Sequence, residues 1–143
     1  MNDRATTAAA GDAGRLEIFY DRSCPICTTE MEALAERDGG ARLTLVDCSR
    51  AGFAVDQPDA PSREALMHRI HARDASGRWL RGIDVFVAAY RAAGFRRIAR
   101  VLDAPLLRPL FDRLYGPVAD HRRLLSALGL HRALAWALRR PRR

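Results

Sequence analysis

The chain has 143 residues, enough for one domain with a hydrophobic core, and its hydrophobic share of 48% is ordinary for a globular protein. No stretch approaches the roughly 18 consecutive apolar residues of a membrane-spanning helix, so we expect no segment that spans a bilayer. The net charge is +7, but all 24 basic residues are arginines and only 7% of the residues are aromatic. Because bases are usually held by aromatic side chains between the cations, we expect no nucleic-acid binding.

The two ends of the chain differ in composition from its middle. Residues 1–14 are small and polar and lack the apolar core of a secretory signal, so we expect a disordered leader and a cytoplasmic protein. Residues 124–143 combine leucines with arginines and end in Arg-Arg-Pro-Arg-Arg, which predicts a basic amphipathic helix and tail. Residues 15–123 are expected to form the domain itself with a helical extension.

The first elements predict a strand–helix–strand unit. Residues 15–21 are short and apolar on both faces, as in a central strand covered by helices. A helix follows from Pro25 to the glycines at 39–40, with apolar residues on one face and Glu30, Glu32 and Glu36 on the other. Residues 41–49 form a second strand, which a right-handed crossover places parallel to the first.

An antiparallel hairpin is expected next. Ser62 is a candidate cap for a short helix in the loop that precedes it. Residues 65–74 alternate between apolar and polar, a three-residue turn follows, and residues 78–83 return. These two segments therefore read as paired strands.

Helices complete the predicted fold. Asp84 is a candidate cap for a helix that Gly94 ends. The order βαβ followed by ββα matches a thioredoxin-like α/β fold. Beyond Gly94 the apolar positions recur at helical spacing, with a break predicted at residues 116–117, so additional C-terminal helices should pack on the domain.

The strongest chemical signal is the Cys-Pro-Ile-Cys motif at the junction of the first strand and helix. Cys24 falls at the N-terminus of the helix, where unpaired backbone N–H groups and the helix dipole favour a thiolate. Cys27 lies one turn deeper on the same face, close enough to attack a mixed disulfide at Cys24. Pro25 suits the first turn, because its missing N–H has no intrahelical partner there. The motif predicts a redox-active pair.

Alternatives remain for these and for nearby residues. A metal site is not expected, because no second Cys-x-x-Cys follows and the predicted strand points His68 and His71 to opposite faces. Two inert core cysteines are the other alternative. Cys48 ends the second strand, where it is either a further redox thiol or a small half-buried residue. Asp21 either accepts a proton during exchange or hydrogen-bonds the loop backbone as an Asx turn.

Residues 20–27, Tyr-Asp-Arg-Ser-Cys-Pro-Ile-Cys, resemble the Tyr-Asp-x-x-Cys-Pro-x-Cys signature of the DCC family of thiol-disulfide oxidoreductases, which are small thioredoxin-like bacterial proteins. The likeness continues through residues 77–92, with their Gly-x-Asp-x-Phe segment, and residues 106–115. It implies an enzyme that exchanges disulfides through Cys24 and Cys27 and that needs no cofactor. Its partner would be a disulfide-containing protein or a low-molecular-weight thiol.

Two segments depart from the related patterns. Thioredoxins place a cis-proline before the third core strand, and residues 64–69 contain no proline, so substrate docking is expected to differ. The family's Tyr-x-x-Ala-x-Asn-Arg ending takes the form Leu-Tyr-Gly-Pro-Val-Ala-Asp-His-Arg-Arg at residues 114–123. A function of another class also fits the sequence. It is a redox-sensing or non-catalytic module that binds an acidic protein or a membrane surface through the arginine-rich helical tail.

Overall fold

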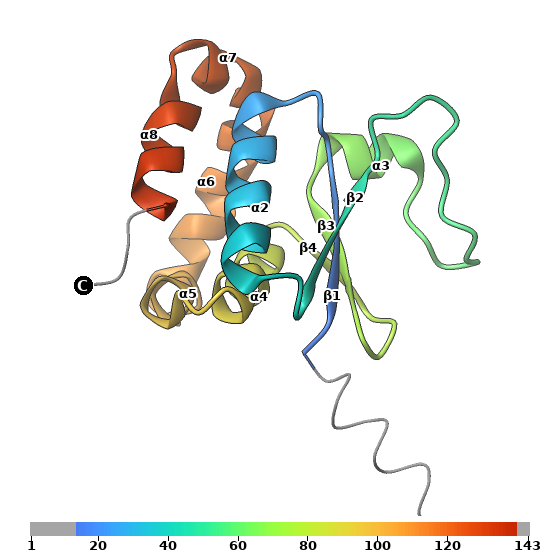
Figure 1. Ribbon diagram of the computed structural model, residues 1–143, viewed down its shortest axis with the longest axis horizontal. Helices are drawn as coiled ribbons and strands as arrows, with labels where there is room; N and C mark the ends of the chain where they lie inside the picture. The colour runs from blue at the N-terminus through green and yellow to red at the C-terminus, as the bar shows by residue number, and fades with distance from the viewer. Residues whose placement is uncertain (1–13, 140–143) are drawn as a thin grey trace, which may run out of the picture.

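The computed structural model describes residues 14–139, so the expected leader lies outside the described residues apart from Gly14, as do the last four residues of the tail (Figure 1). The elements are, in chain order, β1 (Leu16–Tyr20), α2 (Pro25–Asp38), β2 (Leu43–Asp47), α3 (Arg63–His68), β3 (His71–Asp74), β4 (Trp79–Arg81), α4 (Ile83–Ala92), α5 (Arg96–Leu102), α6 (Arg108–Asp120), α7 (Arg122–Ala127) and α8 (Leu130–Leu138). In this part of the chain no helix is both long and apolar enough to cross a membrane.

The four strands form one mixed sheet in the order β2-β1-β3-β4. β1 pairs with β2 in parallel, with Ile18 opposite Leu45. β3 runs antiparallel to β1, with Ala72 opposite Ile18, and β4 runs antiparallel to β3. This topology confirms the predicted thioredoxin-like α/β fold with its βαβ and ββα halves.

The two faces of the sheet bury different clusters, because successive side chains of a strand point to opposite sides. Leu16 and Ile18 belong to the main core, which also contains Met31 and Leu34 of α2 and residues of α4. Phe19, the residue after Ile18, points to the other side and packs in a smaller cluster with residues of α3 and the loop before it. α2 and α4 therefore cover one face, and α3 covers part of the other.

Local signals explain the bounds of α2. Pro25 occupies its first turn, and Gly39 ends it in the left-handed conformation with a φ of 67°. The N–H of Gly39 is satisfied by the last carbonyls of the helix. Because Pro25 favours the first turn of a helix, α2 starts immediately after Cys24.

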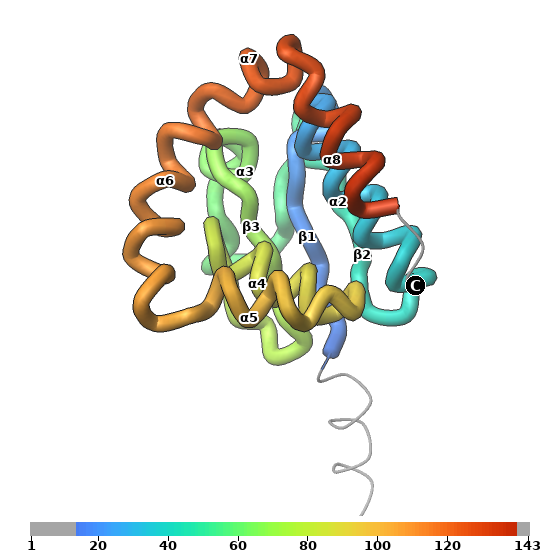
Figure 2. Tube along the Cα trace, turned by 90° about the vertical axis from the view of Figure 1, so that its left-hand side faces the viewer, coloured from blue at the N-terminus to red at the C-terminus, as the bar shows by residue number. Residues whose placement is uncertain are grey.

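The C-terminal helices form an outer layer on the α2 side of the molecule (Figure 2). α8 lies along α2, where Leu138 is buried and Leu134 packs on the main core. α6 stands apart from α2, and α7 joins the two sides at the end where α2 begins (Figure 2). The tail residues are therefore split between two short helices, with Gly129 in the left-handed conformation between them, and do not form one continuous helix.

The structure corrects two local expectations around α3 and α4. Residues 65–68 are helical, because Ser62 Oγ accepts a hydrogen bond from the Ala65 N–H and starts α3, so the strand begins only at His71. Gly82, with a φ of 60°, is the cap of α4, and Asp84 lies inside the first turn. A side chain at residue 82 would also meet the ring of Tyr115, at 3.3 Å from its added Cβ.

The predicted break at residues 116–117 is also wrong, since α6 continues through Pro117. A proline inside a helix costs about 3 kcal/mol. Tertiary contacts on both sides of Pro117 offset this cost: the Tyr115 hydroxyl accepts a hydrogen bond from the Ile70 N–H, and Ala119 is buried. The sequence shows the proline but not these long-range contacts.

Candidate active site

Cys24 is the N-cap residue of α2 and has an extended backbone conformation. The loop that brings it there is closed by a hydrogen bond from the Cys24 N–H to the Asp21 carbonyl at 3.2 Å. Cys24 is fully buried, with 0% of its surface exposed, whereas Cys27 is partly exposed. The helix N-terminus expected from the sequence is therefore present, but the sulfur at its mouth is covered.

The two sulfurs interact with each other, and this interaction sets their acidities. The pKa of Cys24 falls from its ordinary 9.0 to about 6, chiefly because the Cys27 thiol donates a hydrogen bond to its sulfur. The Cys27 backbone N–H and the charge of Arg122 lower this pKa further, while burial and the charge of Asp21 oppose them. The same hydrogen bond, together with burial, raises the pKa of Cys27 far above its ordinary range. Cys24 is thus the sulfur that ionises.

Arg122, at the start of α7, joins three parts of the site. Its Nη2 donates to the Met67 carbonyl at 2.6 Å and to Asp21 Oδ2 at 3.4 Å, and its Nη1 donates to the His68 carbonyl at 3.1 Å. Its Nε is buried and makes no hydrogen bond with any described residue. The spacing of residues in the sequence did not identify Arg122 as a site residue. The available signal was its position as the last residue of the segment that corresponds to the family's Tyr-x-x-Ala-x-Asn-Arg pattern.

Asp21 is buried beside this arginine and organises the loop before Cys24. Its Oδ1 accepts hydrogen bonds from the Ser23 backbone N–H at 2.9 Å and from the Ser23 hydroxyl at 2.5 Å. This is the geometry of an Asx turn, the structural alternative for Asp21. The carboxylate therefore shapes the loop and anchors Arg122.

Glu30 lies one turn beyond Cys27 on α2. Its Oε1 accepts a hydrogen bond from the Tyr90 hydroxyl at 2.6 Å. Burial raises the pKa of Glu30 from 4.5 to about 7 despite this hydrogen bond, and the charge of Glu30 contributes to the raised pKa of Cys27. Glu30 was expected opposite the apolar face of the helix, with Glu32 and Glu36. Its partner Tyr90 on α4 is 60 residues away, so local spacing does not indicate this contact.

Cys48 is not brought into this group. It is fully buried in the smaller cluster with Phe19 and Leu66, on the face of the sheet opposite α2. Burial raises its pKa to about 12, and its thiol donates weakly to the Val46 carbonyl at 3.8 Å. A neutral thiol in this environment is a poor nucleophile.

The histidines differ from expectation because residues 65–68 are helical. His68 ends α3 and is exposed, 3.9 Å from Asp120, whereas His71 is buried on β3 with its Nδ1 at 2.9 Å from the Arg69 carbonyl. Within residues 14–139, no three Cys, His, Asp or Glu side chains gather as metal ligands.

A cavity of about 280 Å³ lies beside the cysteine pair, between α2, α4, α6 and α7. Its lining is almost entirely apolar, with charged groups only at Glu30 and Arg122. We call it the α2–α6 cavity; it is lined by Ile26, Cys27, Glu30, Met31, Ile70, Ile83, Phe86, Phe111, Leu114, Tyr115, Val118, Ala119, Arg122 and Leu125. The partly exposed sulfur of the pair therefore faces an apolar space.

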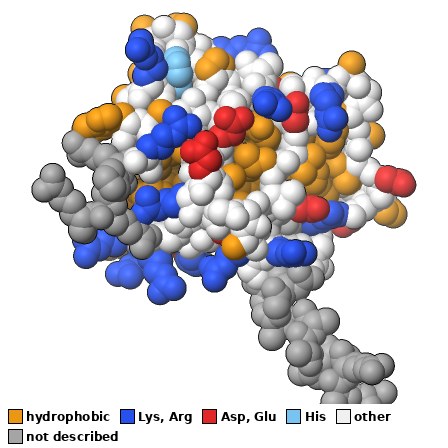
Figure 3. Space-filling view, in the orientation of Figure 1, with side chains coloured by type: hydrophobic (Ala, Val, Ile, Leu, Met, Phe, Trp, Pro, Cys, Tyr) orange, Lys and Arg blue, Asp and Glu red, His pale blue; other side chains and the backbone are white. Residues whose placement is uncertain are grey.

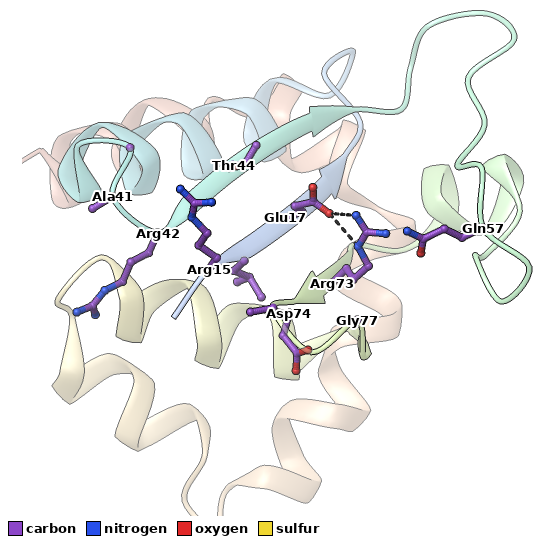
Figure 4. A pocket seen from close by; sticks show the side chains of 12 residues that line it. Arg15, Glu17, Ala41, Arg42, Thr44, Gln57, Arg73, Asp74 and Gly77 are labelled. Atoms are coloured by element: carbon purple, nitrogen blue, oxygen red, sulfur yellow. Dashed lines mark hydrogen bonds and ion pairs between the residues drawn. The ribbon is translucent and has the colours of Figure 1, made fainter. Parts of the chain in front are cut away.

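A larger hollow of about 480 Å³ lies at the other end of the sheet, near the starts of β1 and β2 (Figure 4). Its lining is polar, and Arg73 points toward Glu17, with which it forms an ion pair (Figure 4). Since Cys24 follows the end of β1, this hollow is remote from the pair. It contributes no sulfur and no nucleophile to the site.

Comparison with known proteins adds to this geometry. The family model described as DCC1-like thiol-disulfide oxidoreductase matches residues 18–128. The chain belongs to this family. An uncharacterized chloroplastic protein of Arabidopsis thaliana is 24% identical over 109 residues, which cover 76% of this chain and 51% of that protein. The chain thus spans about half the length of this relative. No solved structure matches the chain.

The part of this DCC1-like protein that the family model matches includes both the Cys-x-x-Cys motif and the residues that surround it in space. Asp21, Glu30 and Arg122 all fall within residues 18–128. α8, by contrast, begins at Leu130, beyond the matched residues. The site is therefore built from the family's part of the chain, and its family name indicates a redox role acting on thiols or disulfides.

Proposed function

We propose that this DCC1-like protein exchanges disulfides, with Cys24 as the nucleophile and Cys27 as the resolving thiol. The observation that supports this most is the hydrogen bond from the Cys27 thiol to the Cys24 sulfur, which lowers the pKa of Cys24 to about 6. At that pKa, about nine-tenths of Cys24 is thiolate at neutral pH. A thiolate, not a thiol, attacks disulfides.

In the first step the Cys24 thiolate attacks one sulfur of a substrate disulfide. The substrate S–S bond breaks, a mixed disulfide forms at Cys24, and the other substrate sulfur leaves as a thiolate that takes up a proton. Cys24 then carries no negative charge and no longer accepts the Cys27 hydrogen bond. Because that hydrogen bond is the largest cause of the raised pKa of Cys27, its loss makes Cys27 more acidic.

In the second step Cys27 loses its proton and attacks the Cys24 sulfur. Glu30, one turn away with a pKa of about 7, is the base that accepts this proton. The mixed disulfide breaks, the second substrate sulfur leaves as a thiolate, and a Cys24–Cys27 disulfide remains. Two electrons have passed from the protein to the substrate, and an external dithiol returns them.

Access to Cys24 requires a local movement, because the sulfur is fully buried. α7 lies against the start of α2, where Ser126 Oγ accepts a hydrogen bond from the Ile26 N–H at 3.1 Å. A substrate disulfide must therefore reach the pair from the side of Cys27, or the residues that cover Cys24 must open transiently.

Reduction of a model protein disulfide in the presence of dithiothreitol tests this function. Cys24→Ser should abolish the catalysed rate, and Cys27→Ser should accumulate a mixed disulfide between Cys24 and the substrate. Cys48→Ser is the matched control and should keep the rate, since Cys48 lies in the other cluster. A Cys24→Ser protein with the wild-type rate would refute the proposal.

A second candidate function is contact with an acidic protein or an anionic membrane surface. Leu128, in the turn between α7 and α8, and Trp136 of α8 remain 69% and 62% exposed, and arginines gather along the lower edge of the face in Figure 3. Sedimentation with anionic phospholipid vesicles tests it. Binding to the vesicles should weaken in Leu128→Asp and Trp136→Asp proteins. Equal binding by the wild type and both variants would show that Leu128 and Trp136 do not contact the membrane surface. The cytoplasmic location stays a prediction.

A further inference from the structure

Main-chain docking of a substrate at the start of β3 is blocked in this protein. Ile70, the residue before β3, lines the α2–α6 cavity. Its N–H donates to the Tyr115 hydroxyl at 3.1 Å, and its carbonyl accepts from the Gly82 N–H at 3.2 Å. Both backbone groups are therefore occupied, so a substrate chain must be held here by side-chain contacts.

The cavity offers such contacts directly beside the reacting sulfurs. Cys27 is part of its wall, and the Cys27 thiol donates a hydrogen bond to Cys24. At about 280 Å³ the cavity lies just below the roughly 300–1,000 Å³ typical of pockets for drug-sized ligands. It is better matched to a single large side chain than to a whole cofactor.

The mouth of the cavity is apolar and unusually exposed. Leu114 and Val118 line the cavity from α6, yet they are 50% and 51% exposed. Leu110 of α6 and Leu107, the N-cap residue of α6, lie four and seven residues before Leu114 and continue this apolar stripe. An occupant would remove this apolar surface from water, which stabilises the complex in proportion to the area covered.

The charges at the cysteine end select the character of the occupant. Glu30 is half-buried there, and its Oε1 accepts a hydrogen bond from the Tyr90 hydroxyl, so an acidic side chain would be repelled. Arg122 is already held by Asp21 and by two backbone carbonyls, and its charge would repel a basic side chain. An uncharged apolar side chain meets neither penalty.

We propose that the α2–α6 cavity is a specificity pocket that takes a large apolar side chain next to a half-cystine in a polypeptide substrate. This inference rests on the proposed function, because the pocket is useful only if the pair exchanges disulfides. The side chain enters past Leu114 and Val118 and brings the neighbouring half-cystine to the pair. The sulfur chemistry is the two-step exchange already described, with dithiothreitol as the external reductant in the test.

Two synthetic disulfides of equal charge test the pocket. Each is a disulfide-linked dimer of a blocked pentapeptide, either Gly-Leu-Cys-Leu-Gly or Gly-Ser-Cys-Ser-Gly. Wild-type protein should reduce the leucine peptide with a kcat/KM about tenfold higher than the serine peptide, because only leucine gains from burial in an apolar pocket.

Variants of two exposed leucines distinguish binding in the cavity from nonspecific hydrophobic contact with the protein surface. Leu114→Ser, at the mouth, should reduce the preference for the leucine peptide to about threefold or less. Leu106→Ser is the matched control, since Leu106 is 94% exposed and does not line the cavity, and it should keep the full preference. Alkylation of Cys24 by iodoacetamide confirms that the pair is intact in both proteins.

The possible failures are distinguishable. If both peptides are reduced equally well by a reaction that needs Cys24, the pocket is refuted and the oxidoreductase stands. If Leu106→Ser loses the preference as much as Leu114→Ser does, the preference does not come from the cavity, and the pocket is again refuted. If neither peptide nor a model protein disulfide is reduced, both the proposed function and the pocket are wrong.

Discussion

Replacing Arg122 by methionine should raise the pKa of Cys24. Three influences lower this pKa from 9.0 to about 6: the Cys27 thiol, the Cys27 backbone N–H and, as the smallest of the three, the charge of Arg122. A nearby opposite charge changes a pKa by about 1–3 units, so we expect about one unit from the loss of Arg122. The buried carboxylate of Asp21 also loses its partner, and its charge raises the pKa of Cys24 in the same direction.

The rate of alkylation by iodoacetamide, measured as a function of pH, reports this pKa. A shift from about 6 to about 7 lowers the thiolate fraction at pH 7 from about nine-tenths to about one half, so the rate at pH 7 should fall about twofold. The limiting rate at high pH should not change, because Cys24 is fully ionised there in both proteins. Loss of the signal in a Cys24→Ser protein, and its retention in a Cys48→Ser protein, assign the signal to Cys24.

Two further variants keep the test decisive. Arg123→Met removes the next arginine, which is exposed, and should leave the pKa unchanged. Arg122→Lys keeps a positive charge, so the pKa of Cys24 should stay close to its wild-type value if the effect of methionine comes from the loss of charge. An unchanged pKa in a folded Arg122→Met protein would refute the electrostatic role of Arg122.

The other predictions concern Glu30, Tyr115 and Cys48. Glu30→Gln should slow release of the mixed disulfide by about 10²-fold in a rapid-quench experiment, because Cys27 loses its proton acceptor, and an unchanged rate would exclude this role. The same variant bears on stability. The pKa of Glu30 is raised from 4.5 to about 7 in the folded protein. The contribution of Glu30 to the free energy of unfolding is therefore fully present below pH 4.5 and is lost as the pH rises through 7. Urea unfolding should show this decline in the wild type and not in the Glu30→Gln variant. Tyr115→Phe leaves the Ile70 N–H without its partner and should lower the free energy of unfolding by about 1–3 kcal/mol, whereas an unchanged urea midpoint would show that the hydrogen bond is dispensable. Cys48, with a pKa of about 12, should resist iodoacetamide in the native protein and react only after unfolding; rapid native labelling at neutral pH would contradict its raised pKa.

The sequence predicted the parts of this structure that local signals determine. The proline and glycines that bound α2, the short apolar runs at residues 15–21 and 41–49 and the order of the elements were sufficient for the thioredoxin-like sheet and for placing Cys24 at a helix N-terminus. Residues 65–68 were assigned to a strand because their alternation was weighed above the Ser62 cap that starts α3. Here a capping hydrogen bond prevailed over a short alternating pattern.

The rest of the site depends on contacts between distant segments. Arg122 meets Asp21 across 101 positions, and Glu30 meets Tyr90 across 60. No spacing rule connects such residues, and the α6 helix that forms the cavity wall was expected to break at Pro117. The tertiary hydrogen bond of Tyr115 holds that helix in place, and only the folded structure shows it.

The most direct test of the central claim is equilibration of the full chain with glutathione buffers of graded potential, followed by mass mapping of the cysteines. We predict a single two-electron transition, with a tenfold change in the oxidised-to-reduced ratio for about 30 mV, in which Cys24 and Cys27 become one disulfide and Cys48 remains a free thiol. Retention of all three thiols across the range, or a disulfide that includes Cys48, would contradict the proposed pair.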